Sequence, residues 1–390
     1  MTSDPERAGF DPARLTALVA ALQRQVDAGR MPGAVFHVER RGVVAAAGCL
    51  GLADPVRRSP MRIDTIFRIH SMTKPIVSVA LMRFFEKALV RLDHPVARFL
   101  PEFATTKKLV ESYGHEVQVA PGRAMTVQDL LRHTAGLTYE FLPPSAVRRH
   151  YIASDLSSRR RSNAELVAAL AGLPLQHEPG SVWEYSRATD VLGRLVEVLA
   201  DRPLGEHLRE ALFDPLGMTD TGFHVGTDRH DRIADAFAVD PDGGPAPALI
   251  DVREPARLES GGGGLVSTSG DYARFLRMLL GGGRLDGARV LGPKTVEFMT
   301  SDHLGAVPIA CPDVLPPGHG FGLGFAVRLA TGIAAVPGSP GTYGWGGSAG
   351  TVFFVDPHEE MFALMMIQAP NQREEFQQLF RNMVYAAIDG

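Results

Sequence analysis

Segments with the composition of β-strands stand near both ends of this chain, and a long helix-rich stretch separates them. Residues 33–39 and 42–49 flank a tight turn, and residues 351–355 and 361–367 flank a polar hairpin segment. An unpaired strand edge exposes backbone donors and acceptors, so each hairpin needs a partner. We therefore expect both hairpins to share one antiparallel sheet.

Helical periodicity predicts the elements that cover this sheet. Residues 11–28 and 374–388 carry apolar side chains at helical spacing, and Asp11 can cap the first helix. Proline and glycine loops interrupt the middle of the chain, where further helices are expected. These internal helices are predicted at residues 127–133, 163–171 and 190–200.

The expected fold class is α/β, an α+β sandwich in which an antiparallel sheet is flanked by N- and C-terminal helices. A mainly helical domain is inserted into it. The predicted division gives an α/β domain of residues 1–79 and 226–390 and a helical domain of residues 80–225, with the active site at their interface.

Composition narrows the function classes. The 390 residues are 45% hydrophobic and 22% charged with a net charge of -4, which suits a large core and gives no general attraction to nucleic acid or anionic membranes. The N-terminus lacks a signal-like pattern and no apolar run could cross a bilayer, so a cytoplasmic location is expected. Basic spots at residues 148–149 and 159–161 are interpreted as solvated surface.

No metal or cofactor is expected. The 13 histidines form no metal-binding motif, and Cys49 and Cys311 have no ligand spacing, so both are expected to be buried free thiols. The glycine run at residues 261–264 lacks the lysine and hydroxyl of a phosphate loop, and we interpret it as a flexible turn.

The motif that carries chemistry is Ser71-Met72-Thr73-Lys74, just ahead of an apolar run. Residues three apart on a helix are neighbours, so the Lys74 amine can reach the Ser71 hydroxyl. A serine is a weak nucleophile until a base takes its proton. The helix dipole and burial both disfavour a charged ammonium at this position, which favours an amine that acts as a base. The alternative is that Ser71 merely caps the helix.

Two further stretches bear on that choice. Tyr185 lies between a Pro-Gly turn and a predicted helix, where a tyrosine can face a cleft. Trp345, Gly346, Gly347 and Ser348 stand at a strand, where small residues allow close backbone approach to a ligand. Taken singly, Tyr185 and Trp345 are more often structural.

Taken in order, these motifs resemble the serine β-lactamase and penicillin-binding-protein superfamily, whose motif is S-x-x-K. The resemblance extends from about residue 10 to the C-terminus. In detail the chain is similar to the class C β-lactamase-like family VIII carboxylesterases, which carry Trp-Gly-Gly where β-lactamases have Lys-Thr-Gly. Supporting stretches lie at residues 66–68, 130–137, 179–180, 215–218 and 260–267.

The resemblance implies a role for each residue. Ser71 would be the acyl-accepting nucleophile, Lys74 its base, and Tyr185 the group that relays protons to the leaving alcohol and the deacylating water. Backbone N–H groups of Ser71 and Ser348 would form the oxyanion hole, and Trp345, Gly346 and Gly347 would line the substrate site.

Departures from the lactamase pattern concern the substrate. Trp345 offers an apolar face where β-lactamases have a lysine, so neutral esters are favoured. Arg187 stands where β-lactamases and peptidases have the asparagine of their Tyr-x-Asn motif. It either binds an acidic group or is a surface arginine, and we prefer the second interpretation. The stretch around Ser348 spells G-x-S-x-G, but strand residues follow it where a nucleophile elbow needs a helix.

The sequence thus predicts a cofactor-free serine carboxylesterase that hydrolyses short-chain, small-molecule esters. One alternative keeps the nucleophile but makes the protein a β-lactamase, D-amino-peptidase or acyltransferase. Another is a non-catalytic binding or assembly relative. The sequence predicts neither the physiological ester, its stereochemistry nor the oligomeric state.

Overall fold

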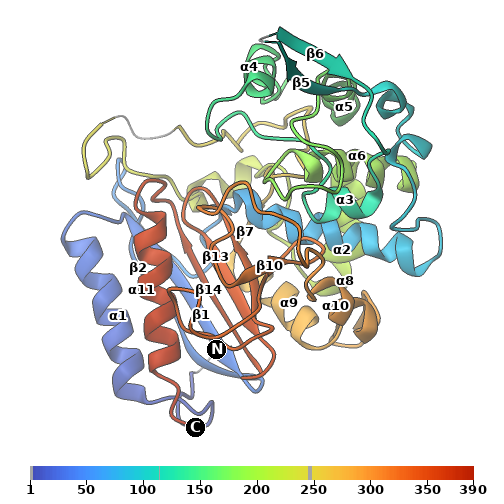
Figure 1. Ribbon diagram of the computed structural model, residues 1–390. Helices are drawn as coiled ribbons and strands as arrows, with labels where there is room; N and C mark the ends of the chain where they lie inside the picture. The colour runs from blue at the N-terminus through green and yellow to red at the C-terminus, as the bar shows by residue number, and fades with distance from the viewer. Residues whose placement is uncertain (1–2, 114, 245–247) are drawn as a thin grey trace.

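A central antiparallel sheet organises the chain. The computed structural model describes residues 3–113, 115–244 and 248–390. Eight strands hydrogen-bond in the order β10-β11-β12-β13-β14-β1-β2-β3, so strands from the two ends of the chain meet where β1 pairs with β14 (Figure 1). The strands span Gly33–Arg40 (β1), Val43–Asp54 (β2), Ser59–Pro60 (β3), His319–Phe321 (β10), Ala326–Arg328 (β11), Tyr343–Gly346 (β12), Val352–Asp356 (β13) and Met361–Ile367 (β14). The predicted shared sheet is confirmed.

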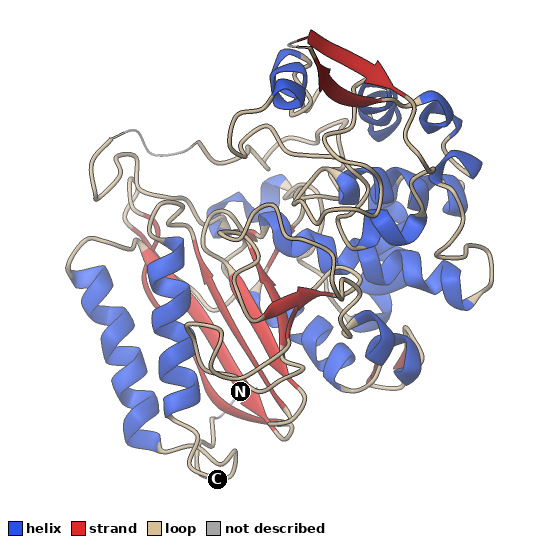
Figure 2. Ribbon diagram, in the orientation of Figure 1, coloured by secondary structure: helices blue, strands red, loops and turns tan. Residues whose placement is uncertain are grey.

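Both faces of the sheet are covered. Helices α1 (Pro12–Asp27) and α11 (Arg373–Ala386) lie side by side on one face, as Figure 2 shows. Successive side chains of a strand point to opposite faces, and β14 follows this rule: Met365 packs in the core under α1 and α11, whereas Leu364 packs in the core on the other side. Burial on both sides explains why β14 is apolar throughout.

The helix-rich middle of the chain lies beside the sheet (Figure 1). Helix α2 (Thr73–Glu86) runs between the two parts and packs against α6 (Ala188–Ala200). The remaining helices span Val127–Leu131 (α3), Ala146–Ala153 (α4), Asn163–Ala171 (α5), Leu204–Leu208 (α7), Asp214–Leu216 (α8), Ser269–Leu280 (α9) and Pro293–Met299 (α10). Short 3₁₀ turns span His70–Met72 (η1), Val96–Arg98 (η2), Pro101–Thr105 (η3) and Thr227–Arg232 (η5), and a π-helical turn spans Arg209–Phe213 (η4).

Short strand pairs complete the structure. Strand β4 (Phe67–Arg68) pairs with β7 (Val266–Ser267) next to η1, and β8 (Arg284–Leu285) pairs with β9 (Ala288–Arg289). The hairpin of β5 (Lys108–Ser112) and β6 (His115–Val119) was not predicted, and its residues are half-buried or exposed. The division into two domains stays a prediction. Among the described helices, none is both long and apolar enough to cross a membrane.

The expectations for Cys49 and for Arg148 are wrong. Cys49 and Cys311 are free thiols, but only Cys311 is buried, since Cys49 lies exposed on β2. Arg148 is not solvated loop surface: it lies buried on α4, where its guanidinium forms an ion pair with Glu184 at 3.0 Å. A buried charge needs such a partner.

Candidate active site

Ser71 lies in the tight turn that leads into α2. The turn η1 places it two residues ahead of the helix, and the N-cap position of α2 is Met72, which makes no capping bond through its side chain. Tyr272 from α9 fixes the turn by donating its hydroxyl to the Met72 carbonyl oxygen at 2.9 Å. Ser71 therefore does not serve as the helix cap, and its side chain is available to the pocket.

Lys74 points back to Ser71 as the spacing predicts. Its Nζ donates to Ser71 Oγ at 3.2 Å and to the Gly262 carbonyl oxygen at 2.6 Å, and only 1% of the residue is exposed. Nζ also lies 4.5 Å from the ring centre of Tyr185 and 5.3 Å from that of Tyr139. The amine is thus held by one carbonyl and two aromatic faces, with Ser71 as its hydroxyl partner.

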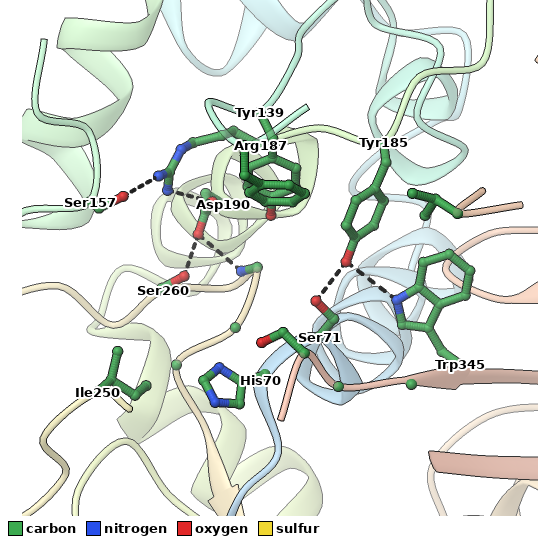
Figure 3. Close-up of a pocket in the computed structure, with 18 of the residues that line it drawn as sticks. His70, Ser71, Tyr139, Ser157, Tyr185, Arg187, Asp190, Ile250, Ser260 and Trp345 are labelled. Atoms are coloured by element: carbon green, nitrogen blue, oxygen red, sulfur yellow. Dashed lines mark hydrogen bonds and ion pairs between the residues drawn. The ribbon is translucent and has the colours of Figure 1, made fainter. Parts of the chain in front are cut away.

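Tyr185 reaches the same oxygen from the other side. It lies in the segment just before α6, and its hydroxyl donates to Ser71 Oγ at 2.6 Å. Trp345 on β12 donates from Nε1 to the Tyr185 hydroxyl oxygen at 3.4 Å (Figure 3). The structure therefore brings together Ser71, Lys74, Tyr185 and Trp345 from three separate parts of the chain.

Aromatic packing holds the Tyr185 ring. Its centre lies 5.1 Å from the rings of His133 and Tyr139 and 5.4 Å from that of Trp345. Burial, with Lys74 nearby, lowers the pKa of His133 well below its ordinary value, so this imidazole is neutral. These contacts restrict Tyr185 to the orientation that reaches Ser71.

The turn after β12 forms the opposite wall. Gly347 donates its backbone N–H to the Thr351 carbonyl oxygen at 2.7 Å, and a Cβ at Gly347 would lie 2.6 Å from the Ile69 carbonyl oxygen. Only glycine fits this approach. Ser348 is exposed and lines the pocket with Gly346 and Gly347. Because β13 follows this turn, the G-x-S-x-G stretch has a strand where an elbow needs a helix.

A buried carboxylate that the sequence did not reveal supports the site. Asp190 on α6 accepts from Ser260 Oγ at 2.5 Å and from the Gly262 backbone N–H at 3.0 Å. Gly262 is the residue whose carbonyl accepts from Lys74. The glycine run thus forms a turn, as predicted, and Gly262, Gly263 and Gly264 line the pocket. The composition of the run was the only signal of this role.

Arg187 is not a surface arginine. Its guanidinium contacts Glu140 at 2.6 Å and Asp190 at 3.4 Å, and its side chain is 9% exposed. Although burial opposes the charge, Asp190 and Glu140 raise the pKa of Arg187. Its acidic partners are therefore residues of the protein itself.

The pocket that contains Ser71 has a volume of about 640 Å³. Its walls combine the polar groups above with apolar side chains, namely Phe141, Phe223, Ile250, Leu258, Val314 and Trp345. A hollow of this size suits a small ligand. Within residues 3–113, 115–244 and 248–390, no three His, Cys, Asp or Glu side chains gather as metal ligands would.

Comparison with known proteins identifies the family. The beta-lactamase family model matches residues 18–388. Esterase EstB of Burkholderia gladioli is 35% identical over 372 residues, which covers 90% of this chain and 90% of EstB. Among solved structures, EstCE1, described as a hydrolase with promiscuous acyltransferase activity, superposes with a TM-score of 0.83 at 29% identity over 96% of this chain and 99% of its own. Simvastatin synthase LovD of Aspergillus terreus superposes with a TM-score of 0.80 at 25% identity. The superposition covers 96% of this chain and 98% of LovD.

The chain belongs to the beta-lactamase family. Its fold is that of the β-lactamase and transpeptidase proteins, and the predicted superfamily is confirmed. Because its relatives include an esterase and a structurally similar hydrolase, the protein is a serine hydrolase of esterase or acyltransferase type.

Proposed function

We propose that this protein is a serine carboxylesterase that hydrolyses short-chain esters through an acyl-enzyme on Ser71. The observation that carries the proposal is that Lys74 Nζ and the Tyr185 hydroxyl both lie within hydrogen-bond distance of one oxygen, Ser71 Oγ. An amine and a phenol converging on a serine hydroxyl supply the two proton-transfer groups that acyl transfer needs.

In the acylation step, Ser71 Oγ attacks the carbonyl carbon of the ester while Lys74 Nζ takes the hydroxyl proton. The carbonyl oxygen becomes an oxyanion, for which the backbone N–H groups of Ser71 and Ser348 are the proposed donors. As the tetrahedral intermediate breaks down, Lys74 returns this proton through the Tyr185 hydroxyl to the departing alcohol oxygen, so that Lys74 is again an amine and Tyr185 a phenol. The alcohol leaves, and the acyl group stays on Ser71.

In the deacylation step, water takes the place of the alcohol. As the water oxygen attacks the acyl carbon, its proton passes through the Tyr185 hydroxyl to Lys74 Nζ, and it returns to Ser71 Oγ when the acid is released. If an alcohol attacks instead, the same intermediate gives acyl transfer. That second candidate function is favoured by the likeness to EstCE1, whose description includes acyltransferase activity.

Trp345 supports the preference for neutral esters near the nucleophile. Its indole packs against Tyr185 and offers one N–H, which is directed at the Tyr185 hydroxyl. It provides no positive charge for a carboxylate next to the scissile bond, as the lysine of a β-lactamase would. Efficient β-lactam or D-amino-peptide hydrolysis is therefore not expected.

Steady-state hydrolysis of p-nitrophenyl acetate tests the proposal. Ser71→Ala is expected to abolish turnover without loss of fold, whereas Ser348→Ala keeps its backbone N–H and most of the turnover. Retained activity in Ser71→Ala would refute the proposal. Higher efficiency on nitrocefin than on simple esters would favour the β-lactamase alternative.

A further inference from the structure

Arg159 lines the active-site pocket, although its sequence neighbourhood predicts solvated surface. The residue is half-buried, and among the residues that the structure describes its guanidinium donates to one group, the Glu254 carbonyl oxygen, at 3.3 Å. Its own carbonyl accepts from Leu258 N at 3.4 Å, which ties it to the segment that leads to Ser260. Arg159 is therefore a fixed part of the pocket wall.

The charge of Arg159 has no carboxylate partner. No ion pair of this residue occurs within the described ranges, and the six residues outside them are Met, Thr, Gly, Pro, Ala and Pro, none with an acidic side chain. The Asp251 carboxylate interacts with the Arg159 guanidinium only through longer-range electrostatic attraction. The other pocket arginines differ, since Arg187 pairs with two carboxylates and Arg373 contacts Glu374 at 3.4 Å.

The surroundings of Arg159 remove part of the hydration of its charge. The apolar side chains of Ile250 and Leu258 line the same pocket. Burial lowers the pKa of Arg159, as expected for a cation that has lost part of its hydration. A half-desolvated guanidinium with free donors is a binding group for a carboxylate, which it can contact with two parallel hydrogen bonds.

The position relative to the nucleophile suits the far end of a substrate. Figure 3 shows Ser157, Ser260 and Ile250 on one side of Ser71 and Trp345 on the other. Arg159 is next but one to Ser157 in the chain and is bonded to the segment before Ser260. An ester that reacts at Ser71 and extends along this wall brings its distal end toward Arg159.

We propose that the preferred substrates are esters that carry a carboxylate several atoms from the scissile bond, and that Arg159 binds this carboxylate. The inference rests on the proposed esterase function and names its substrate class. The carboxylate can belong to the acyl part or to the alcohol part of the ester, and the two arms of the experiment below separate these cases.

Matched substrate pairs test the proposal. The acyl arm compares mono-p-nitrophenyl adipate, pimelate and suberate with the corresponding p-nitrophenyl esters that end in a carboxamide. These chains are long enough that the carboxylate does not readily attack its own ester. The alcohol arm compares the acetyl esters of ω-hydroxyhexanoate and ω-hydroxyhexanamide by acetate release. We expect kcat/KM to favour the carboxylate in one arm, with an optimum chain length.

Variants assign the preference to Arg159. Arg159→Gln should lower kcat/KM for the preferred carboxylate ester by roughly ten- to a hundredfold, mainly through KM, because hydrogen bonds to a charged group are lost. The value for the carboxamide ester should fall much less, because its neutral group forms no charge-assisted pair with Arg159. Arg159→Lys keeps the charge and should restore part of the preference. Arg160→Gln is the matched control, because Arg160 is the exposed neighbour and does not line the pocket.

The outcomes are decisive. A preference that survives Arg159→Gln, or that Arg160→Gln abolishes equally, overturns the proposal, and so does the lack of any carboxylate preference in both arms. In those cases Ser71-dependent hydrolysis of the neutral esters would leave the esterase function standing. Turnover that persists in Ser71→Ala would instead remove the proposed function itself.

Discussion

Replacing Tyr185 by phenylalanine removes one hydroxyl from the pocket and leaves the ring in place. The hydroxyl donates to Ser71 Oγ at 2.6 Å and accepts from Trp345 Nε1 at 3.4 Å. The ring contacts with His133 and Trp345, at 5.1 and 5.4 Å between centres, do not involve the hydroxyl. Tyr185→Phe should therefore fold, and its effect should be confined to chemistry.

The expected magnitudes separate catalysis from stability. A positioned acid–base group contributes about 10²- to 10⁴-fold, which is roughly 3–5 kcal/mol of transition-state stabilisation at about 1.36 kcal/mol per factor of ten. The lost hydrogen bond costs the folded state only about 0.5–1.5 kcal/mol. The turnover number of Tyr185→Phe should thus fall at least about a hundredfold, while the free energy of unfolding changes little.

The assay is p-nitrophenyl acetate hydrolysis under steady-state conditions, with urea denaturation of the same samples. Tyr385→Phe is the matched control, because Tyr385 on α11 donates its hydroxyl to Asp356 at 2.8 Å outside the pocket. It should lose stability but keep its activity. A Tyr185→Phe variant with nearly full turnover would refute the assignment of Tyr185 as proton relay.

Three further predictions concern the same pocket. Lys74→Met removes the amine but keeps an apolar side chain of similar length, so acylation measured as a p-nitrophenol burst should slow by about 10²- to 10⁴-fold; an unchanged burst would exclude Lys74 as the base. Asp190→Asn weakens the hold on Gly262, so kcat should fall and its pH profile should shift, whereas a loss of thermal stability alone would indicate a purely structural role. Burial, with Arg68 and Lys74 nearby, lowers the pKa of His70 to about 4. In the unfolded chain the His70 imidazole binds a proton below about pH 6.5, whereas in the folded protein it does so only near pH 4. Unfolding between these pH values therefore takes up a proton, and the free energy of unfolding should decrease by up to about 3 kcal/mol as the pH falls from about 6.5 to 4. His70→Asn, which tolerates the backbone φ of 43°, should flatten that dependence in urea titrations, and an unchanged slope would contradict the burial argument.

Local patterns in the sequence carried the predictions that succeeded. The contact between Ser71 and Lys74 follows from their spacing of three residues, which the turn η1 and the start of α2 both preserve. The hairpin of β13 and β14 follows from two apolar runs around a polar turn. The meeting of Tyr185 and Trp345 with Ser71 depends on segments far apart in the chain, so only the resemblance to a family could suggest it.

Long-range partners explain what the sequence did not reveal. Whether an arginine is buried depends on a carboxylate from another segment: Arg148 finds Glu184, and Arg187 finds Glu140. The role of Gly262 likewise depends on Asp190 from one segment and Lys74 from another. The local sequence around these residues does not predict such contacts, because the contacts form only when α2, α6 and the glycine run pack together.

The most direct test of the central claim is covalent labelling of the nucleophile. The protein is treated with a p-nitrophenyl phosphonate ester, and intact mass followed by peptide mapping locates the adduct. The account predicts one phosphonyl group per chain, bound to Ser71 Oγ and absent from Ser71→Ala. An adduct on Ser348, or no adduct in a protein that still hydrolyses esters, would contradict it.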